Sequence, residues 1–177
     1  MSYNIFINDG HNIILSQSYS KNMGLYGMRI GALSFVTSNK IEKINVLDKL
    51  KSIIRANYSN PPIEGARIVS EIINDTELNE IWNQEIKIMA NRIIDMREQL
   101  QKILINLGSK KDWSHITKQI GMFCYTGLTK EQVDIMINEY HIYMTYDGRI
   151  SMAGITPANI NYIANSIHNV TKYYELE

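Results

Sequence analysis

The sequence ILSQSYSKNMGLYGMRIGALSFV, residues 14–36, runs from an apolar stretch into a polar turn with one lysine, Lys21, and then into glycines spaced around an arginine, Arg29. Its two apolar runs are short and bounded by Gly, Asn or Ser, which is typical of buried strands in an α/β sheet. A helical repeat of isoleucine and leucine follows in residues 40–56. The order strand, turn, strand, helix predicts an α/β fold for this region.

A second region begins with a long amphipathic helix. Asn74 and Glu77 have the spacing of a capping box, and Gly108 ends the apolar repeat. The repeat at threes and fours comprises Leu78, Trp82, Met89, Ile93, Met96, Leu100, Ile103 and Leu107. Apolar helix faces generally exist to be buried, so this stripe indicates core packing rather than a cofactor site.

The remaining segments predict a compact α+β unit. GMFCYTG precedes a helix that opens with a capping box of Thr129 and Gln132. HIYMTYD and RISMAGI follow as two strand-like runs. A last helix starts at Thr156 and Pro157, with threonine as the N-cap and proline at the first helical position. Helix, antiparallel strands and helix together form such a unit.

The composition narrows the class of partner. The 177 residues are 45% hydrophobic and 20% charged, and 18 basic residues balance 18 acidic ones. No net field therefore draws the chain to nucleic acid or to an anionic membrane, and a small ligand or another protein is the expected partner. Cys124 is the single cysteine and the four histidines are scattered, so the sequence offers no metal-ligand spacing. The first residues, MSYNIFINDG, lack the features of a signal or transit peptide, so we expect a cytoplasmic location.

Lys21 has an unusual setting for a lysine in a polar turn, which is ordinarily only solvated. Three serines precede it and three glycines surround Arg29, namely Ser16, Ser18, Ser20, Gly24, Gly27 and Gly31. Hydroxyls, a guanidinium and a backbone kept small by glycine could together hold a phosphate dianion. A lysine beside such a phosphate could form a Schiff base with an aldehyde cofactor. The order GxxxxGK[ST] is absent, so the segment is not a P-loop.

The segment SQSYSKNMGLYGMRIGALS closely resembles the lysine segment of the aspartate aminotransferases, pyridoxal-phosphate enzymes of fold type I. The resemblance continues in the family's order through IIRANYSNPPIEGARIV, GMFCYTGLT and YDGRISMAGITPANINYIANSIH. It implies the C-terminal part of the fold type I α/β transferase. Residues 1–75 would be the end of the large cofactor-binding domain, residues 76–108 a long connecting helix and residues 109–177 the small domain.

The resemblance also implies roles for residues at the cofactor. Lys21 matches the lysine that forms the Schiff base with pyridoxal 5'-phosphate and carries a proton between the substrate α-carbon and the cofactor. Ser18 and Arg29 match residues that contact the cofactor phosphate, for which a guanidinium is suited because it directs two donors at the oxygens.

At the substrate, Arg149 matches the arginine that binds the α-carboxylate, although without the resemblance it would read as a surface arginine at a hairpin. Arg55 matches the arginine that pairs with the substrate's side-chain carboxylate from the neighbouring subunit, which implies a homodimer. Two arginines for two carboxylates explain dicarboxylate selectivity, since an unpaired charge in a closed site is costly. Phe123 matches a phenylalanine near the substrate, although without the resemblance it could equally be an ordinary residue of the hydrophobic core.

The stretch SNPP is a rigid turn, because Pro61 and Pro62 cannot both lie inside a helix or a central strand. In the family this turn lies near the dimer interface, which places Ser59 and Asn60 close to the partner's site. Met28 departs from the family, which commonly has an acidic residue beside the arginine.

The activity implied is reversible amino transfer between L-aspartate and 2-oxoglutarate, giving oxaloacetate and L-glutamate. Family members are more than twice as long, and the part without a match here holds the aspartate that pairs with the pyridine nitrogen. We therefore expect that this chain alone does not transaminate. Two alternatives remain: an aromatic amino acid aminotransferase of the same fold, and a non-catalytic chain that acts only as an interaction surface.

Overall fold

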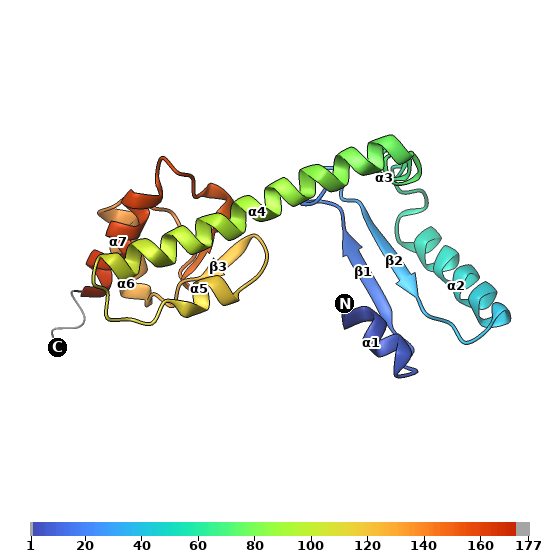
Figure 1. The fold of residues 1–177 in the computed structure, drawn as a ribbon. Helices are drawn as coiled ribbons and strands as arrows, with labels where there is room; N and C mark the ends of the chain where they lie inside the picture. Colours follow the sequence, from blue (N-terminus) through green and yellow to red (C-terminus); the bar gives the residue numbers. More distant parts are fainter. Residues whose placement is uncertain (1, 173–177) are drawn as a thin grey trace. The chain divides into compact units, whose positions relative to one another are not determined.

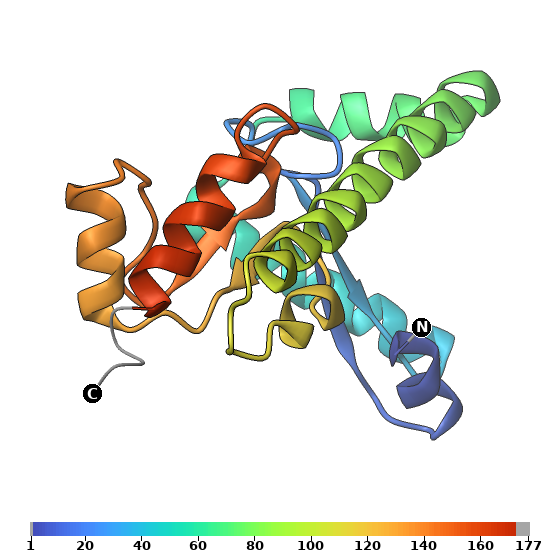
Figure 2. The same cartoon turned by 60° about the vertical axis from the view of Figure 1, so that its left-hand side comes forward.

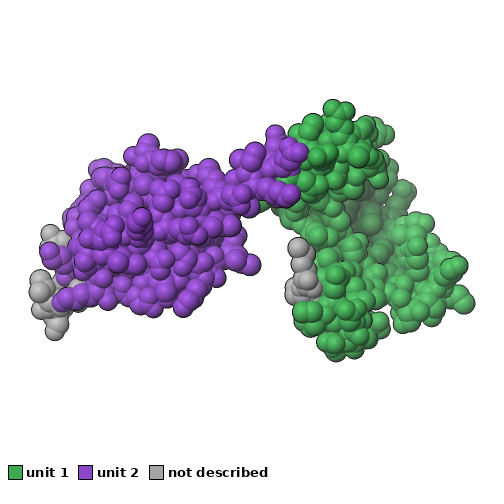
Figure 3. All heavy atoms as spheres, viewed as in Figure 1, with its two compact units in different colours: residues 1–83 green, residues 84–177 purple. Residues whose placement is uncertain are grey.

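The computed structural model describes residues 2–172, and the chain divides into two compact units, residues 1–83 and residues 84–177, here called unit 1 and unit 2 (Figure 3). The division falls within one continuous helix, α4 (Thr76–Asn106), whose first residues belong to unit 1 and whose remainder belongs to unit 2 (Figure 1). Within residues 2–172 no helix is long and apolar enough to cross a membrane.

Unit 1 is built on a two-stranded antiparallel ribbon. Its elements are α1 (Ser2–Asn8), β1 (Ile14–Ser18), β2 (Gly31–Phe35), α2 (Lys40–Tyr58), α3 (Glu64–Asn74) and the start of α4 (Figure 1). The strands pair with Ile14 opposite Phe35 and Ser18 opposite Gly31. The predicted order of strand, turn, strand and helix is confirmed.

The burial predicted for these strands is wrong for the chain by itself. Ile14 is 64% exposed, Leu33 is 56% exposed, and α2 has no buried residue. The reason is that within residues 2–172 the ribbon has no third strand, so it is not part of a larger sheet there. Val69 is the single buried hydrophobic residue of unit 1 among those described.

The predicted capping box at the start of α4 is also wrong. The N–H of Leu78 donates to the Asp75 side chain at 2.9 Å, whereas the Asn74 amide donates to the carbonyl of Ser70, four residues earlier in α3. Asn74 is still the last residue of α3, so its side chain bonds within that helix. The carboxylate of the next residue, Asp75, caps α4 instead. The predicted end at Gly108 is confirmed, since this glycine has a φ of 76° just after the helix.

Unit 2 packs helices around a second short ribbon. After α4 it contains α5 (Ser114–Lys118), β3 (Phe123–Tyr125), α6 (Lys130–Asn138), β4 (Arg149–Ser151), a 3₁₀ turn η1 (Met152–Gly154) and α7 (Ile160–Lys172). The strands are antiparallel, with Phe123 opposite Ser151 and Tyr125 opposite Arg149. Helices α6 and α7 lie side by side in both views (Figures 1 and 2). The capping box of Thr129 and Gln132 is confirmed.

Three predicted elements of unit 2 differ in the structure. Of the strand-like run RISMAGI only residues 149–151 form a strand, and η1 follows directly. HIYMTYD is not a strand, because residues 141–145 have no regular structure and the chain then turns, with the N–H of Gly148 donating to the carbonyl of Thr145. The last helix begins at Ile160 rather than at Thr156 and Pro157. The Asn159 side chain accepts a hydrogen bond from the Thr156 N–H at 2.7 Å, which stabilises a turn ahead of the regular helix.

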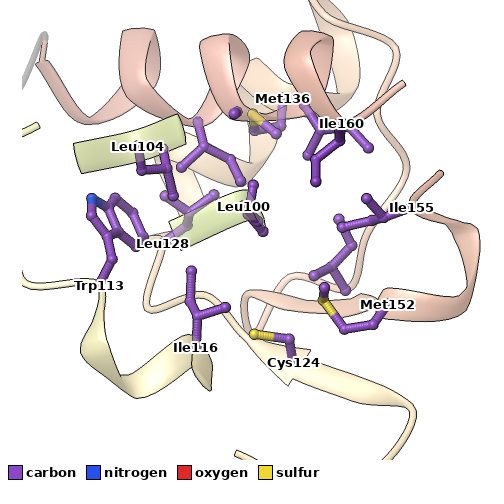
Figure 4. Close-up of a cluster of buried hydrophobic side chains, with 14 of the residues drawn as sticks. Leu100, Leu104, Trp113, Ile116, Cys124, Leu128, Met136, Met152, Ile155 and Ile160 are labelled. Carbon is purple, nitrogen blue, oxygen red and sulfur yellow. The ribbon is translucent and has the colours of Figure 1, made fainter. Parts of the chain in front are cut away.

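The hydrophobic core lies in unit 2 and is organised by α4 (Figure 4). Met96, Leu100 and Leu104 of this helix are buried, as the apolar stripe predicts. They pack with residues from every later element, including Trp113, Ile116, Cys124, Leu128, Val133, Met136, Ile150, Met152, Ile155, Ile160, Ile163, Ala164, Ile167 and Val170. Trp113 carries a polar group into this core, and its indole N–H donates to the Ser109 hydroxyl at 2.8 Å.

Leu100→Ala is expected to lower the free energy of unfolding of unit 2 by about 2–5 kcal/mol, because it removes a fully buried side chain and leaves a cavity. The measurement is urea denaturation followed by the fluorescence of Trp113, in a Trp82→Phe background. The matched control is Ile105→Ala on the same helix, where the side chain is 59% exposed and a change within about 0.5 kcal/mol is expected. Equal effects of the two substitutions would contradict this account of the core.

Candidate functional site

Lys21 lies in the turn that joins β1 to β2. The ribbon continues past its last paired residues, because the N–H of Tyr19 donates to the carbonyl of Ile30 at 3.1 Å. The lysine side chain is exposed, and its Nζ lies 4.9 Å from the centroid of the Tyr26 ring. The lysine is thus presented just beyond a strand end, with an aromatic face to hold its ammonium.

Besides backbone hydrogen bonds within the turn, two hydrogen bonds that involve side chains hold it in place within unit 1. The N–H of Ser20, a buried residue, donates to the Ser18 hydroxyl at 3.2 Å. The indole N–H of Trp82 donates to the backbone carbonyl of Asn22 at 2.9 Å, which fixes the residue next to Lys21 against the first part of α4. The side-chain oxygen of Asn22 is buried and has no hydrogen-bond partner among the described residues.

Arg29 closes the second half of the turn with a left-handed backbone, φ 52°. Its Nη1 donates to the carbonyl of Tyr26 at 3.0 Å, and no other partner of its guanidinium is found within residues 2–172. Its neighbours Met28 and Ile30 pack on α3, since a Cβ added at Gly65 would lie 3.3 Å from the Cβ of each. The departure at Met28 therefore supplies packing in place of a charge.

The segment around Lys21 is positively charged. No acidic residue occurs between Asp9 and Glu42, whereas Lys21 and Arg29 lie in that interval. A guanidinium with free donors, the Ser18 hydroxyl and a lysine without a local carboxylate suit the charge and the acceptor oxygens of a phosphate ester. The residues present here fit a phosphorylated cofactor. No group of three or more His, Cys, Asp or Glu side chains that could hold a metal ion occurs in the described part of the chain.

In unit 2, Arg149 and Phe123 come together from the two short strands. The guanidinium carbon of Arg149 lies 4.9 Å from the centroid of the Phe123 ring, a cation–π contact, and both side chains are exposed. No hydrogen bond from this guanidinium to a protein oxygen is found among the residues described. The side chain is therefore oriented by the ring while its donors stay available to an anion.

The turn before Arg149 is held by Asp147. The Asp147 carboxylate accepts hydrogen bonds from the Thr145 hydroxyl and from the Arg149 N–H, the latter at 3.2 Å. The Thr145 hydrogen bond lowers the pKa of Asp147 most, followed by the Arg149 N–H and, after a small opposing effect of burial, the Arg149 charge. This carboxylate fixes the backbone at the start of β4.

Arg55 lies in the last turn of α2, exposed, and no side-chain partner of it is found in residues 2–172. Ser59 follows it with a φ of 59°, and the turn through Asn60 leads to the two prolines. The structure therefore brings Ser18, Lys21 and Arg29 onto one hairpin, and it joins Arg149 with Phe123. It gives Arg55 no described partner.

Sequence analysis missed three residues that support these sites. Tyr26 lies five positions after Lys21 and Asp147 two before Arg149, and neither spacing by itself signals a contact. Trp82 was noticed only as part of an apolar stripe. Its indole N–H was a usable signal, because such a group normally finds an acceptor when it is partly buried.

Comparisons with known proteins give one consistent result. The family description "Aminotransferase class I and II" matches residues 2–167. The chain is 56% identical over 171 residues to the mitochondrial aspartate aminotransferase of Arabidopsis thaliana, covering 97% of the chain and 40% of the relative. It is 58% identical over 168 residues to the mitochondrial aspartate aminotransferase of Dictyostelium discoideum, covering 95% and 39%.

A crystal structure of the aromatic-amino-acid aminotransferase from Burkholderia pseudomallei, covalently bound to pyridoxal phosphate, is similar with a TM-score of 0.92 and 42% identity. The match covers 96% of this chain and 42% of that one. The fold and the matched residues define a chain of the fold type I transferases, which confirms the predicted fold class. The chain belongs to the class I and II aminotransferase family. It spans about 40% of the length of the curated relatives it matches, at their C-terminal portion.

The predicted cytoplasmic location is wrong, because the relatives from Arabidopsis and Dictyostelium are both named mitochondrial. The prediction rested on reading the first ten residues as a possible targeting segment.

Gly31→Ala is expected to disrupt the pairing that carries Ser18 and Lys21. The added Cβ would lie closer than 3.0 Å to the backbone carbonyl oxygen of Gln17, so one strand has to shift. Overpacking of this kind costs about 1–3 kcal/mol, so the Tyr19 amide should exchange with solvent about fivefold faster or more. Hydrogen exchange measured by NMR tests this. Gly27→Ala is the control, since its Cβ meets nothing within 4 Å; equal exchange in both variants would contradict the role of Gly31.

Asp147→Asn is expected to reduce the change in the stability of unit 2 as the pH falls into the acid range. Because the native state lowers the pKa of Asp147, this carboxylate stabilises the fold above its ordinary pKa of about 3.9, and that contribution is lost as the pH falls through the lowered native value. The variant should therefore be less stable than the parent near neutral pH, and the difference should shrink in acid. Thermal melting monitored by circular dichroism from about pH 7 to about pH 3 tests the sign. Glu98→Gln, on the exposed face of α4, should show no such convergence.

Proposed function

We propose that this chain forms part of the active site of an aminotransferase that transfers an amino group reversibly between L-aspartate and 2-oxoglutarate, giving oxaloacetate and L-glutamate. The observation that carries the proposal is the single hairpin that holds Ser18, Lys21 and Arg29 without a local carboxylate. The curated relatives, both named aspartate aminotransferases, support the choice of substrate. Their names also support a mitochondrial location for the whole protein.

The cofactor in this proposal is pyridoxal 5'-phosphate, to which the Burkholderia relative is covalently bound. When bound, it supplies an aldehyde carbon for the amino group and a ring that accepts electrons from the substrate α-carbon. The Lys21 amine would hold it covalently. The Ser18 hydroxyl and the free donors of Arg29 would bind its phosphate oxygens.

The chain's own residues would then act on the substrate as follows. Once its amine is released, Lys21 would take the proton from the α-carbon of the amino acid, and in the reverse half of the reaction it would deliver a proton to the α-carbon derived from the oxo acid. Arg149 directs two N–H donors at the α-carboxylate, and the Phe123 ring against the guanidinium restricts the plane in which it does so. The substrate is thereby bound by its α-carboxylate before the proton moves.

Arg55 would bind the second carboxylate of the substrate in the site of the partner subunit of a homodimer. Its exposure and the lack of a described partner within residues 2–172 leave its guanidinium available for this contact. Ser59 and Asn60 would lie near the same interface. In this assignment the C-terminal part of the large domain is residues 1–75. The long connecting helix is residues 76–108, and the small domain is residues 109–177.

A second candidate function is aromatic amino acid transamination, which the likeness to the Burkholderia enzyme favours. An enzyme of this fold can keep both arginines and still accept an aromatic side chain. Competition between L-aspartate and L-phenylalanine in one assay separates the two. Inhibition of aspartate turnover by phenylalanine at similar concentration would favour the broader enzyme.

Lys21→Ala in the complete enzyme is expected to lower kcat by about a thousandfold or more, because it removes the group that moves the proton. The fold should remain, since the lysine side chain is exposed. Borohydride reduction with pyridoxal phosphate, followed by peptide mass analysis, should label Lys21 in the parent and not in the variant. Lys40→Ala is the matched control, an exposed lysine at the start of α2 that should keep both label and turnover. Normal turnover in Lys21→Ala would overturn the proposed function.

A further inference from the structure

Two arginines of α4, Arg92 and Arg97, hold unit 2 together through backbone carbonyls. Arg97 is buried, 3% exposed, and donates to the carbonyls of Ile116, Gly121 and Phe123 at 2.8, 2.9 and 2.6 Å. A guanidinium can make these bonds at once because its donors are spread over a rigid plane. One of the three acceptors, the Phe123 carbonyl, lies in β3 itself.

Arg97 is charged and has no described carboxylate partner. The hydrogen bonds that Arg97 makes to oxygen atoms of the described residues all go to backbone carbonyls, and its Nε is buried without a partner among those residues. The nearby Cys124 thiol does not neutralise it, because burial raises the pKa of Cys124 more than the Arg97 charge lowers it. Burying such a charge is unfavourable unless its hydrogen bonds are well made. An apolar side chain would fill the same space without that penalty, so packing alone does not account for an arginine here.

Arg92 bonds to the segment that follows the other strand, β4. Its Nη1 donates to the carbonyl of Ile155 and its Nη2 to the carbonyl of Ala153, both at 2.9 Å. These acceptors lie in and just after the turn η1, which follows β4 directly. Arg92 therefore fixes the chain a few residues beyond Arg149, as Arg97 fixes β3 at Phe123.

The ribbon that carries Phe123 and Arg149 is too short to hold its own geometry. Each strand has three residues, and the one further backbone bond at this end runs from the Met152 N–H to the Met122 carbonyl at 2.9 Å. Isolated two-stranded ribbons are marginally stable even when longer. The contact of 4.9 Å between the guanidinium of Arg149 and the Phe123 ring depends on the register and the tilt of both strands.

We propose that Arg92 and Arg97 are positioning residues for carboxylate recognition: from one helix they fix β3 and the turn that directly follows β4, so that Phe123 orients the Arg149 guanidinium toward a substrate carboxylate. This inference rests on the proposed role of Arg149. Neither arginine touches the substrate, and both act through the backbone that carries the residue that does.

The test measures steady-state kinetics with L-aspartate and 2-oxoglutarate in the complete enzyme, for Arg92→Gln, Arg97→Lys and Arg149→Lys. A loss of positioning should raise KM for both substrates by about five- to tenfold and leave kcat within about twofold, since binding of the α-carboxylate is weakened in the ground state and in the transition state alike. Titration calorimetry with succinate, an unreactive dicarboxylate, should show the same fold-loss of affinity. Lys102→Gln, an exposed cation on α4, is the control and should change neither value.

The double variant Arg92→Gln, Arg149→Lys separates positioning from general loss of structure. If Arg92 acts through Arg149, the double variant should have nearly the KM of Arg149→Lys alone, because the second change has nothing left to misplace. If the KM of the double variant instead rises by the product of the two single-variant effects, the inference is overturned. If Arg97→Lys fails to fold, as judged by Trp113 fluorescence, the KM values of Arg92→Gln test the inference instead, since Arg92 is exposed.

The failures of the two proposals are distinguishable. If Arg149→Lys leaves KM and succinate affinity unchanged, the proposed carboxylate site is wrong and the positioning inference is overturned with it. If Arg149→Lys raises KM while Arg92→Gln and a folded Arg97→Lys do not, the carboxylate site stands and only the positioning inference is overturned.

Discussion

Burial of the apolar stripe of α4 is the interaction on which the described structure depends. Met96, Leu100 and Leu104 are withdrawn from water, and each later element of unit 2 contributes residues to the core that covers them. The same turns of the helix carry Arg92 and Arg97, whose donors reach the backbone around the β3–β4 ribbon. A single helix thus supplies both the non-directional energy of the core and the directional bonds that position the ribbon.

Unit 1 has no comparable source of stability within the described residues. Its ribbon and α2 expose most of their apolar side chains, and the turn at Lys21 is held chiefly by single hydrogen bonds from Ser20 and Trp82. The contrast fits a chain that spans about 40% of its relatives' length. Apolar faces of this extent are ordinarily covered by another element or another chain.

Local chemistry predicted the parts of the fold that depend on neighbouring residues. The buried later part of the α4 stripe, its end at Gly108 and the capping box at Thr129 follow from spacing alone and are present. The earlier part of the stripe is not buried as predicted, since Leu78 is 40% and Met89 is 47% exposed. The alternation of apolar and polar residues was a weaker guide to the strands. The strand expected at residues 141–147 is absent because tight turn bonds around Thr145 take the backbone groups that a ladder would need.

The candidate site shows the same limit. Lys21 and Arg29 could be selected because the serines and glycines around them are near in sequence, and the resemblance to a family supplied roles for Arg149 and Arg55. The contacts that orient those residues join distant positions, such as Trp82 with Asn22 across 60 residues and Arg97 with Phe123 across 26. No periodicity or short motif encodes such pairs.

These long-range bonds share one property: the donor is a side chain and the acceptor is a backbone carbonyl. Trp82, Arg92 and Arg97 all donate in this way. Every residue type has such a carbonyl, so positions such as Asn22 and Ala153 can change in evolution without loss of the bond. The sequence constraint falls on the three donors, and drift in the loops they hold leaves the architecture intact.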